Sequence, residues 1–163
     1  MNPALRDLAT GFLSACRDNA LLVATAESCT GGLIIATLTE IPGSSPMVDR
    51  GFITYSNQAK MEMLGVANAT LDEFGAVSEQ TAREMAEGAL AAAGAGIALS
   101  VTGIAGPDGG SETKPVGMVC FGVAISGGAT IVQTRHFGDI GRANVRNETV
   151  KTALSLGLTA LSE

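Results

Sequence analysis

The sequence predicts an α/β fold in which helices cover both faces of a mixed β-sheet. Residues 21–24 and 97–102 are short apolar runs typical of strands buried on both faces, and each leads into a polar segment that contains glycine. Residues 116–125 and 131–137 are rich in apolar and β-branched residues, and the stretch Ser126-Gly127-Gly128-Ala129-Thr130 between them indicates a hairpin. Together with the helical patterns between them, these runs predict a mixed sheet with a late antiparallel pair.

The first part of the chain alternates between helical and strand patterns. Apolar side chains in residues 5–16 recur at helical spacing, so we expect an amphipathic helix that ends before the first strand. The polar cluster at residues 25–32 then connects this strand to a short helix expected over residues 33–38. Two prolines and a glycine in residues 41–46 exclude a continuous helix or a central strand and predict an exposed loop.

The middle of the chain predicts a strand at residues 51–55 and a helix that starts at Ser56 and stops at Gly65. The connection 66–77 carries a capping pattern typical of one helical turn. The next predicted helix, residues 78–93, has an apolar face made of small residues, so we expect it to lie close to the sheet.

The later loop at residues 103–110 follows the second buried strand and contains four glycines and one proline. Such a glycine content is typical of a loop whose backbone closely approaches a ligand. A last helix is expected over residues 142–161.

Composition limits the class of protein. A chain of 163 residues with 46% hydrophobic residues is long enough for one core and too short for two ordinary domains, so we expect a single domain over residues 1–163. The formal net charge of −6 and the lack of any Lys/Arg run argue against direct contact with nucleic acid. Residues 1–17 lack the apolar centre of a signal peptide, and no apolar run reaches the roughly 20 residues that span a bilayer. We therefore expect a cytoplasmic protein that does not contact membranes.

Cysteine and histidine usage narrows the chemistry. Cys16, Cys29 and Cys120 are odd in number and have no metal-binding spacing, so we expect neither a disulfide framework nor a zinc site. The only histidine, His136, lies within a predicted strand, where a surface or structural role is the better interpretation. A catalytic histidine is therefore not expected.

The polar cluster at residues 25–32 has the densest functional chemistry. Gly31 and Gly32 permit a tight turn or a close approach to a ligand, and the unpaired amides at the start of a helix attract anions. These features predict a phosphate site at Thr30, Gly31 and Gly32. The alternative is that Ser28 or Thr30 only caps the following helix, which is common in α/β proteins.

Three polar segments, 25–32, 43–45 and 102–110, follow or adjoin predicted strands, and we expect them to converge on one pocket. Without histidine, a serine nucleophile needs another base, and lysine serves in serine amidases of unrelated folds. Lys60 is the candidate, provided that burial or nearby positive charge lowers its pKa. The alternative is a solvated surface lysine.

Five segments, found in a fixed order along the chain, carry a resemblance to a known family. The resemblance covers nearly the whole chain, from about Leu5 to Leu161. The segments are Ala26-Glu27-Ser28-Cys29-Thr30-Gly31-Gly32, Gly43-Ser44-Ser45, Gly51-Phe52-Ile53-Thr54-Tyr55-Ser56-Asn57 with Lys60 and Leu64-Gly65-Val66, Gly75-Ala76-Val77-Ser78, and Thr102-Gly103-Ile104-Ala105-Gly106-Pro107-Asp108-Gly109-Gly110. Together they closely resemble the CinA C-terminal domain family, which includes stand-alone nicotinamide mononucleotide deamidases.

The resemblance implies a single three-layer α/β/α domain that hydrolyses the carboxamide of nicotinamide mononucleotide, without metal or other cofactor, to nicotinate mononucleotide and ammonia. The family's functional positions fall at Ser28, Ser45, Tyr55, Lys60, Thr102 and Arg142. Our mechanistic hypothesis has Ser45 as nucleophile, Lys60 as base and Tyr55 as a relay or a donor that orients the lysine. Ser28 is the competing nucleophile.

The remaining family positions are expected to bind substrate. The ribose and phosphate would be held by Thr102, by the loop containing Gly103 and Gly106, and by Arg142. Arg142 would make a charge-assisted contact with the phosphate. If Ser28 is not the nucleophile, the amides around it would stabilise the oxyanion.

Two functions of other classes remain open at this point. A nucleotide-sensing module would keep the phosphate-binding loops without needing Lys60 or the serines, and a competence-related interaction protein would need a docking surface that the sequence does not identify. The resemblance also implies a homo-oligomer, most simply a dimer formed through the helix at residues 78–93 or the late hairpin.

Overall fold

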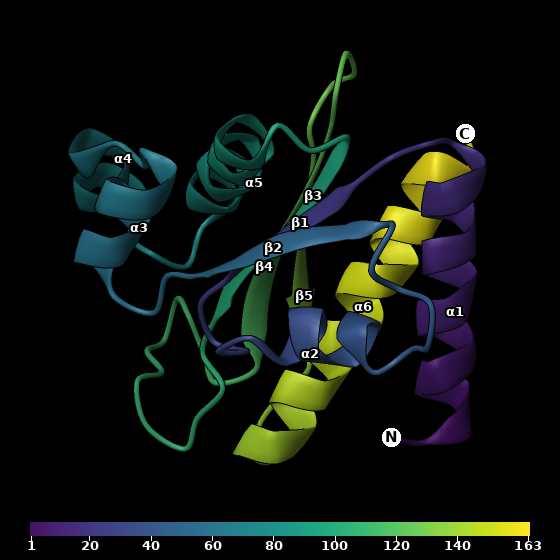
Figure 1. Cartoon of the computed structure of the whole chain (residues 1–163). Coiled ribbons are helices and arrows are strands. Elements are labelled where there is room, and N and C mark those ends of the chain that lie inside the picture. Colours follow the sequence, from purple (N-terminus) through teal and green to yellow (C-terminus); the bar gives the residue numbers. More distant parts are fainter.

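The computed structural model describes all residues of the chain, 1–163, as six helices and five strands (Figure 1). In chain order the elements are α1 (Pro3–Asp18), β1 (Val23–Glu27), α2 (Leu33–Thr39), β2 (Val48–Ile53), α3 (Asn57–Leu64), α4 (Asn68–Phe74), α5 (Glu79–Ala93), β3 (Ile97–Gly103), β4 (Met118–Ile125), β5 (Ile131–His136) and α6 (Arg142–Leu161). The order confirms the predicted α/β class. The main differences are in three elements: residues 68–74 form a helix rather than one turn, β1 extends to Glu27, into the polar cluster, and β2 spans Val48–Ile53 rather than residues 51–55.

The five strands form one mixed sheet in the order β2-β1-β3-β4-β5. β1 is parallel to both β2 and β3, whereas β4 is antiparallel to β3 and β5, so the predicted late hairpin is confirmed. Helices α1, α2 and α6 cover one face of the sheet, and α3, α4 and α5 lie on the other (Figure 1). None of the helices is long and apolar enough to cross a lipid bilayer.

Two apolar clusters lie on the two faces of the sheet. A cluster of 20 buried residues fills the side of α1, α2 and α6, and a cluster of 7 fills the side of α3, α4 and α5. The small residues of α5 allow close packing, because Ser100 Oγ donates to the carbonyl of Ala82 at 2.6 Å. This confirms the expected close approach. It also shows that the small-residue face of α5 packs against the sheet inside the chain.

Strand direction decides which loops can meet. In the parallel register Glu27 pairs with both Ile53 and Val101, so the residues that follow these positions emerge at one edge of the sheet. At the other end Val23 pairs with Val48, and the loop 41–46, which precedes β2, lies at that opposite edge. The expectation that three polar loops converge was therefore right for residues 25–32 and 102–110 and wrong for residues 43–45.

Candidate active site

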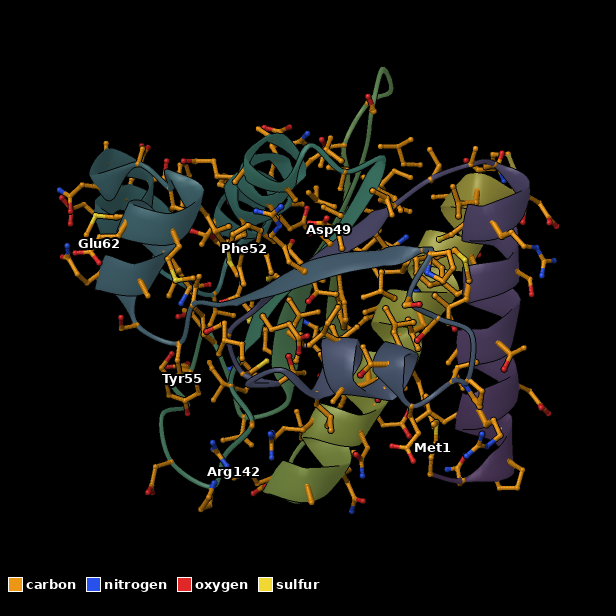
Figure 2. All side chains as sticks on the ribbon, viewed as in Figure 1. Met1, Asp49, Phe52, Tyr55, Glu62 and Arg142 are labelled. Carbon is orange, nitrogen blue, oxygen red and sulfur yellow. The ribbon has the colours of Figure 1, made fainter.

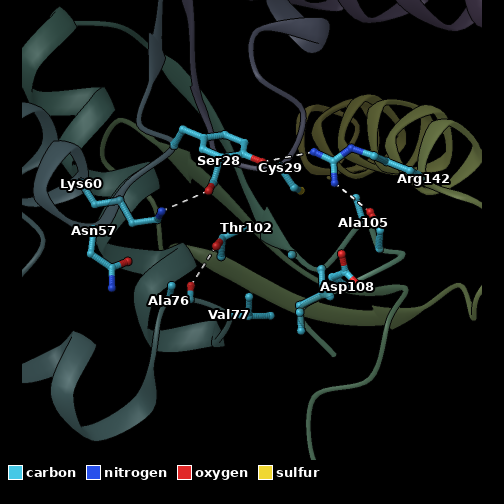
Figure 3. Close-up of a pocket in the computed structure, with 15 residues that line it drawn as sticks. Ser28, Cys29, Asn57, Lys60, Ala76, Val77, Thr102, Ala105, Asp108 and Arg142 are labelled. Atoms are coloured by element: carbon cyan, nitrogen blue, oxygen red, sulfur yellow. Dashed lines mark hydrogen bonds between the residues drawn. The ribbon is translucent and has the colours of Figure 1, made fainter. Parts of the chain in front are cut away.

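A pocket of about 270 Å³ lies at the edge of the sheet where β1, β2 and β3 end (Figure 3). Its walls come from the β1–α2 elbow, the start of α3, residues 76–77, the loop 103–109 and the first residue of α6. Segments from every third of the chain thus meet at one site. The lining contains Ser28, Tyr55, Lys60, Thr102, Gly103, Gly106 and Arg142 of the predicted site residues.

The contact between Lys60 and Ser28 is the centre of this pocket. Ser56 caps α3 through the amide of Ala59, and Lys60 follows in the first turn with a side chain that is only 1% exposed. Its Nζ donates to Ser28 Oγ at 3.0 Å (Figure 3). It also donates to the carbonyl of Thr54 at 3.0 Å. Burial lowers the pKa of Lys60 from its ordinary value of 10.5, because the charged form is poorly solvated. The surface-lysine alternative is therefore excluded, and the geometry required of a serine and its base is present.

Strand alternation separates Ser28 from its neighbour Glu27. Successive residues of a strand point to opposite faces, and here Glu27 points toward α2 whereas Ser28 points toward α3. The carboxylate of Glu27 accepts five hydrogen bonds, from the hydroxyls of Thr25 and Thr30 and from the amides of Gly32, Ile34 and Ile35. The carboxylate of Glu27 therefore already occupies the anion-binding position at the start of α2.

This arrangement corrects the predicted phosphate site at Thr30, Gly31 and Gly32. The hydroxyl of Thr30 donates to Glu27 at 2.6 Å, the amide of Gly31 donates to the carbonyl of Ser28, and the amide of Gly32 donates to Glu27. None of the three residues lines the pocket. Gly32 is needed for another reason, since its φ is +103° and an added Cβ would lie 2.9 Å from Ile53.

Ser45 is not part of this pocket. It lies exposed in the loop before β2, at the edge of the sheet opposite Lys60. The Ser45–Lys60 pair of the sequence-based hypothesis is therefore absent from the structure, and Ser28 takes its place beside the lysine. The order of the segments along the chain could have predicted this separation. Ser45 comes before a parallel strand and Lys60 comes after it, and the two ends of a strand lie at opposite edges of the sheet.

Two features make the surroundings of Ser28 suitable for acyl transfer. The amides of Cys29 and Thr30 donate to no other residue of the chain, whereas the neighbouring amides of Ser28 and Gly31 both do. Cys29 also lines the pocket, but burial raises the pKa of its thiol to about 12, so it remains a protonated thiol at neutral pH. Serine is thus the better-activated nucleophile, with two unpaired donors next to it.

Tyr55 contacts Arg142 rather than Lys60. Its side chain is 62% exposed, and Arg142 Nη2 donates to its hydroxyl at 3.2 Å, while Nη1 donates to the carbonyl of Gly106 at 2.8 Å. Figure 2 shows the two side chains, which come from opposite halves of the sequence, next to each other at the end of the sheet. The expected lysine-orienting role of Tyr55 is not seen, because the carbonyl of Thr54 holds the ammonium instead.

The far end of the pocket is rich in unpaired hydrogen-bond donors. The amides of Ala105, Gly106, Asp108 and Gly109 have no acceptor within the chain, and no carboxylate forms an ion pair with Arg142. Gly106 has a φ of +83°, a backbone conformation that favours glycine. This end of the pocket is suited to an anion.

Thr102 and residues 76–77 form the floor of the site. The hydroxyl of Thr102 donates to the carbonyl of Ala76 at 2.8 Å, which ties the end of β3 to the connection before α5 (Figure 3). Sequence reasoning did not place Asn57, Ala76 or Val77 in the pocket, although all three lie within the segments that carry the family resemblance. No cluster of three or more His, Cys, Asp or Glu side chains is placed to hold a metal ion, and His136 is exposed at the end of β5.

Comparison with known proteins identifies the family. The model of the CinA C-terminal domain matches residues 5–161. The chain belongs to the CinA C-terminal domain family. Its relatives include the nicotinamide-nucleotide amidohydrolase PncC of Enterobacter agglomerans, which is 53% identical over 133 residues that cover 82% of this chain and 81% of that protein.

Other members of the family differ in length. A putative competence-damage inducible protein of Caldicellulosiruptor bescii is 52% identical over 93% of this chain, yet the match spans only 36% of that protein. Among solved structures, the competence/damage inducible protein CihA of Agrobacterium tumefaciens superposes with a TM-score of 0.96 at 50% identity and covers all of this chain and 98% of its own. The CinA fold of this chain therefore recurs both alone and as part of longer proteins.

Proposed function

We propose that this chain is an amidohydrolase that converts nicotinamide mononucleotide and water to nicotinate mononucleotide and ammonia. The contact of the buried Lys60 ammonium with Ser28 Oγ is the observation that carries the proposal. The PncC relative, of which the chain covers 81%, is named for this class of reaction and supports the choice of substrate.

The proposed reaction uses Ser28 as nucleophile and Lys60 as general base and acid. Neutral Lys60 takes the proton of Ser28 Oγ as the oxygen attacks the carboxamide carbon, and the resulting ammonium then gives that proton to the leaving amine. The C–N bond of the carboxamide breaks, ammonia departs, and the nicotinate mononucleotide, with its ribose phosphate still attached, remains bound to Ser28 as an ester. A water molecule, deprotonated by Lys60, attacks this ester and returns the serine. The amides of Cys29 and Thr30 would donate to the oxyanion in both steps.

The anion-binding end of the pocket would take the phosphate of the substrate. Arg142 supplies a guanidinium without a carboxylate partner, and the loop of Gly103 and Gly106 supplies unpaired amides. Thr102 also lines the pocket. Phosphate binding here rather than at the start of α2 follows from the occupation of that helix by Glu27. The ribose would then lie between the two ends.

Ammonia release by the purified protein tests the proposal. We expect release from nicotinamide mononucleotide and much less from the other three compounds. Nicotinamide riboside and free nicotinamide lack the phosphate, and the dinucleotide carries a further adenylate on that phosphate, which a pocket of about 270 Å³ does not accommodate. Intact-mass analysis after rapid quenching should also detect an adduct with the mass of the nicotinate mononucleotide acyl group, and peptide mapping should locate it on Ser28. A folded protein that binds the mononucleotide without releasing ammonia would instead indicate a nucleotide-sensing module.

Replacing Arg142 should weaken substrate binding more than chemistry. For Arg142→Ala we expect KM for the mononucleotide to rise about 10- to 100-fold, the loss expected when a charge-assisted contact worth about 1.5–3 kcal/mol is removed. The small residual activity toward the phosphate-free riboside should not change. Steady-state kinetics on both substrates make the comparison, and Arg83→Ala, which removes a guanidinium outside the pocket, is the matched control. An equal loss on both substrates would argue against a phosphate contact.

A further inference from the structure

Two charged side chains that do not line the pocket hold the β1–α2 elbow from outside. Glu27 is fully buried, and its carboxylate accepts hydrogen bonds from the amides of Ile34 and Ile35 at 2.9 Å and from the hydroxyl of Thr30 at 2.6 Å. It thereby fixes the start of α2 directly behind Ser28. Hydrogen bonds from these donors stabilise the buried carboxylate. The dipole of the helix also favours a negative charge at its start.

Arg146 holds the same elbow from α6. Its Nε donates to the carbonyl of Cys29 at 3.2 Å and its Nη2 donates to the carbonyl of Thr30 at 2.9 Å. No carboxylate forms an ion pair with Arg146, so its interactions within the chain are those with the elbow. The planar fork of a guanidinium suits two adjacent carbonyls in a way that a single ammonium does not.

These contacts set the direction of the unpaired amides. In a trans peptide the carbonyl of one residue points opposite to the amide of the next, so the bond from Arg146 to the Cys29 carbonyl also orients the Thr30 amide. The Ser28 carbonyl accepts from the Gly31 amide at 3.1 Å, which orients the Cys29 amide in the same way. The only amides of residues 28–32 that donate to no other residue of the chain are those of Cys29 and Thr30.

We infer that Glu27 and Arg146 are positioning residues that aim the Cys29 and Thr30 amides at the oxyanion and Ser28 Oγ at Lys60. This inference rests on the proposed amidohydrolase function. The proposed substrate-binding groups, which are Thr102, the loop 103–109 and Arg142, lie outside the elbow. Arg142 shares α6 with Arg146, but it is held by the carbonyl of Gly106 and not by the elbow, so these groups should keep their places when the elbow shifts. Loss of either residue should therefore lower kcat and leave KM nearly unchanged.

The principal test uses Arg146, which lies partly exposed on α6 and whose removal should not prevent folding. For Arg146→Ala we expect kcat to fall about 10- to 100-fold, the cost of displacing a reacting group by about 1 Å, while KM changes less than about twofold. Arg146→Lys should recover part of kcat, because an ammonium can bind one of the two carbonyls. Lys151→Ala removes a positive charge from the same helix outside the pocket and should match the wild type.

A second readout separates positioning from stability alone. An arylsulfonyl fluoride modifies Ser28 at a rate that depends on the elbow and on Lys60 but not on the residues proposed to bind the nucleotide. This rate should fall in Arg146→Ala and in Glu27→Gln. Each protein is assayed equally far below its own Tm, with Asn2→Ala as a control that removes a helix cap far from the pocket. Unchanged labelling and kcat in Arg146→Ala would overturn the inference. A wild type that neither releases ammonia nor is labelled would overturn the proposed function instead.

Discussion

Ser28→Ala is expected to lower kcat for ammonia release by on the order of 10⁴-fold or more, because it removes the atom that forms the acyl intermediate in the proposed reaction. Affinity for the mononucleotide should remain within a few fold, since the phosphate-binding end of the pocket does not involve this serine. Stability should change little, because Lys60 keeps its hydrogen bond to the carbonyl of Thr54. Single-turnover kinetics and calorimetric titration measure the two quantities separately.

Ser45→Ala is the matched control for this experiment. It deletes the same hydroxyl group from an exposed serine at the opposite edge of the sheet and should retain wild-type kcat and KM. The reverse result, an active Ser28→Ala and an inactive Ser45→Ala, would refute Ser28 as nucleophile. It would also require a rearrangement or a second copy of the chain to bring Ser45 to Lys60.

Lys60→Met should have the second largest effect, a fall in kcat of about 10³- to 10⁴-fold, toward the upper end of what general-base catalysis contributes. Methionine has a similar length and no charge, so the pocket should keep its shape and bind the mononucleotide. The free energy of unfolding at neutral pH should rise, because the variant no longer buries an ammonium group. Retained activity in a folded Lys60→Met protein would exclude the lysine as base.

The pH dependence follows from the lowered pKa of Lys60. The reaction requires the neutral amine, so kcat/KM should rise with pH through the pKa of Lys60, with a midpoint below 10.5. The unfolded chain binds the proton more tightly than the folded chain. The cost of burying the charge is therefore fully present below the folded-state pKa and disappears as the pH rises toward 10.5. Urea unfolding at increasing pH should show this rise in stability for the wild type and not for Lys60→Met.

Local patterns in the sequence were enough to predict most of the fold. The apolar runs at residues 21–24 and 97–102 and the β-rich runs around Ser126 to Thr130 correspond to β1, β3, β4 and β5. Propensity and capping also predicted α3 after Ser56 and α5 after Ser78. These features are local because helix caps and strand alternation depend on residues a few positions apart. The Ser28, Lys60 and Arg142 segments were likewise found in the sequence through the family resemblance.

Tertiary structure alone decided which of these groups lie close together. Ser28 meets Lys60 because β1 and β2 run parallel and end at one edge, whereas Ser45 precedes β2 and lies at the other edge. Glu27, rather than a bound phosphate, occupies the start of α2 because strand alternation points its side chain toward that helix. Such pairings depend on strand order and direction, which join residues far apart in the chain, and local sequence patterns do not specify them.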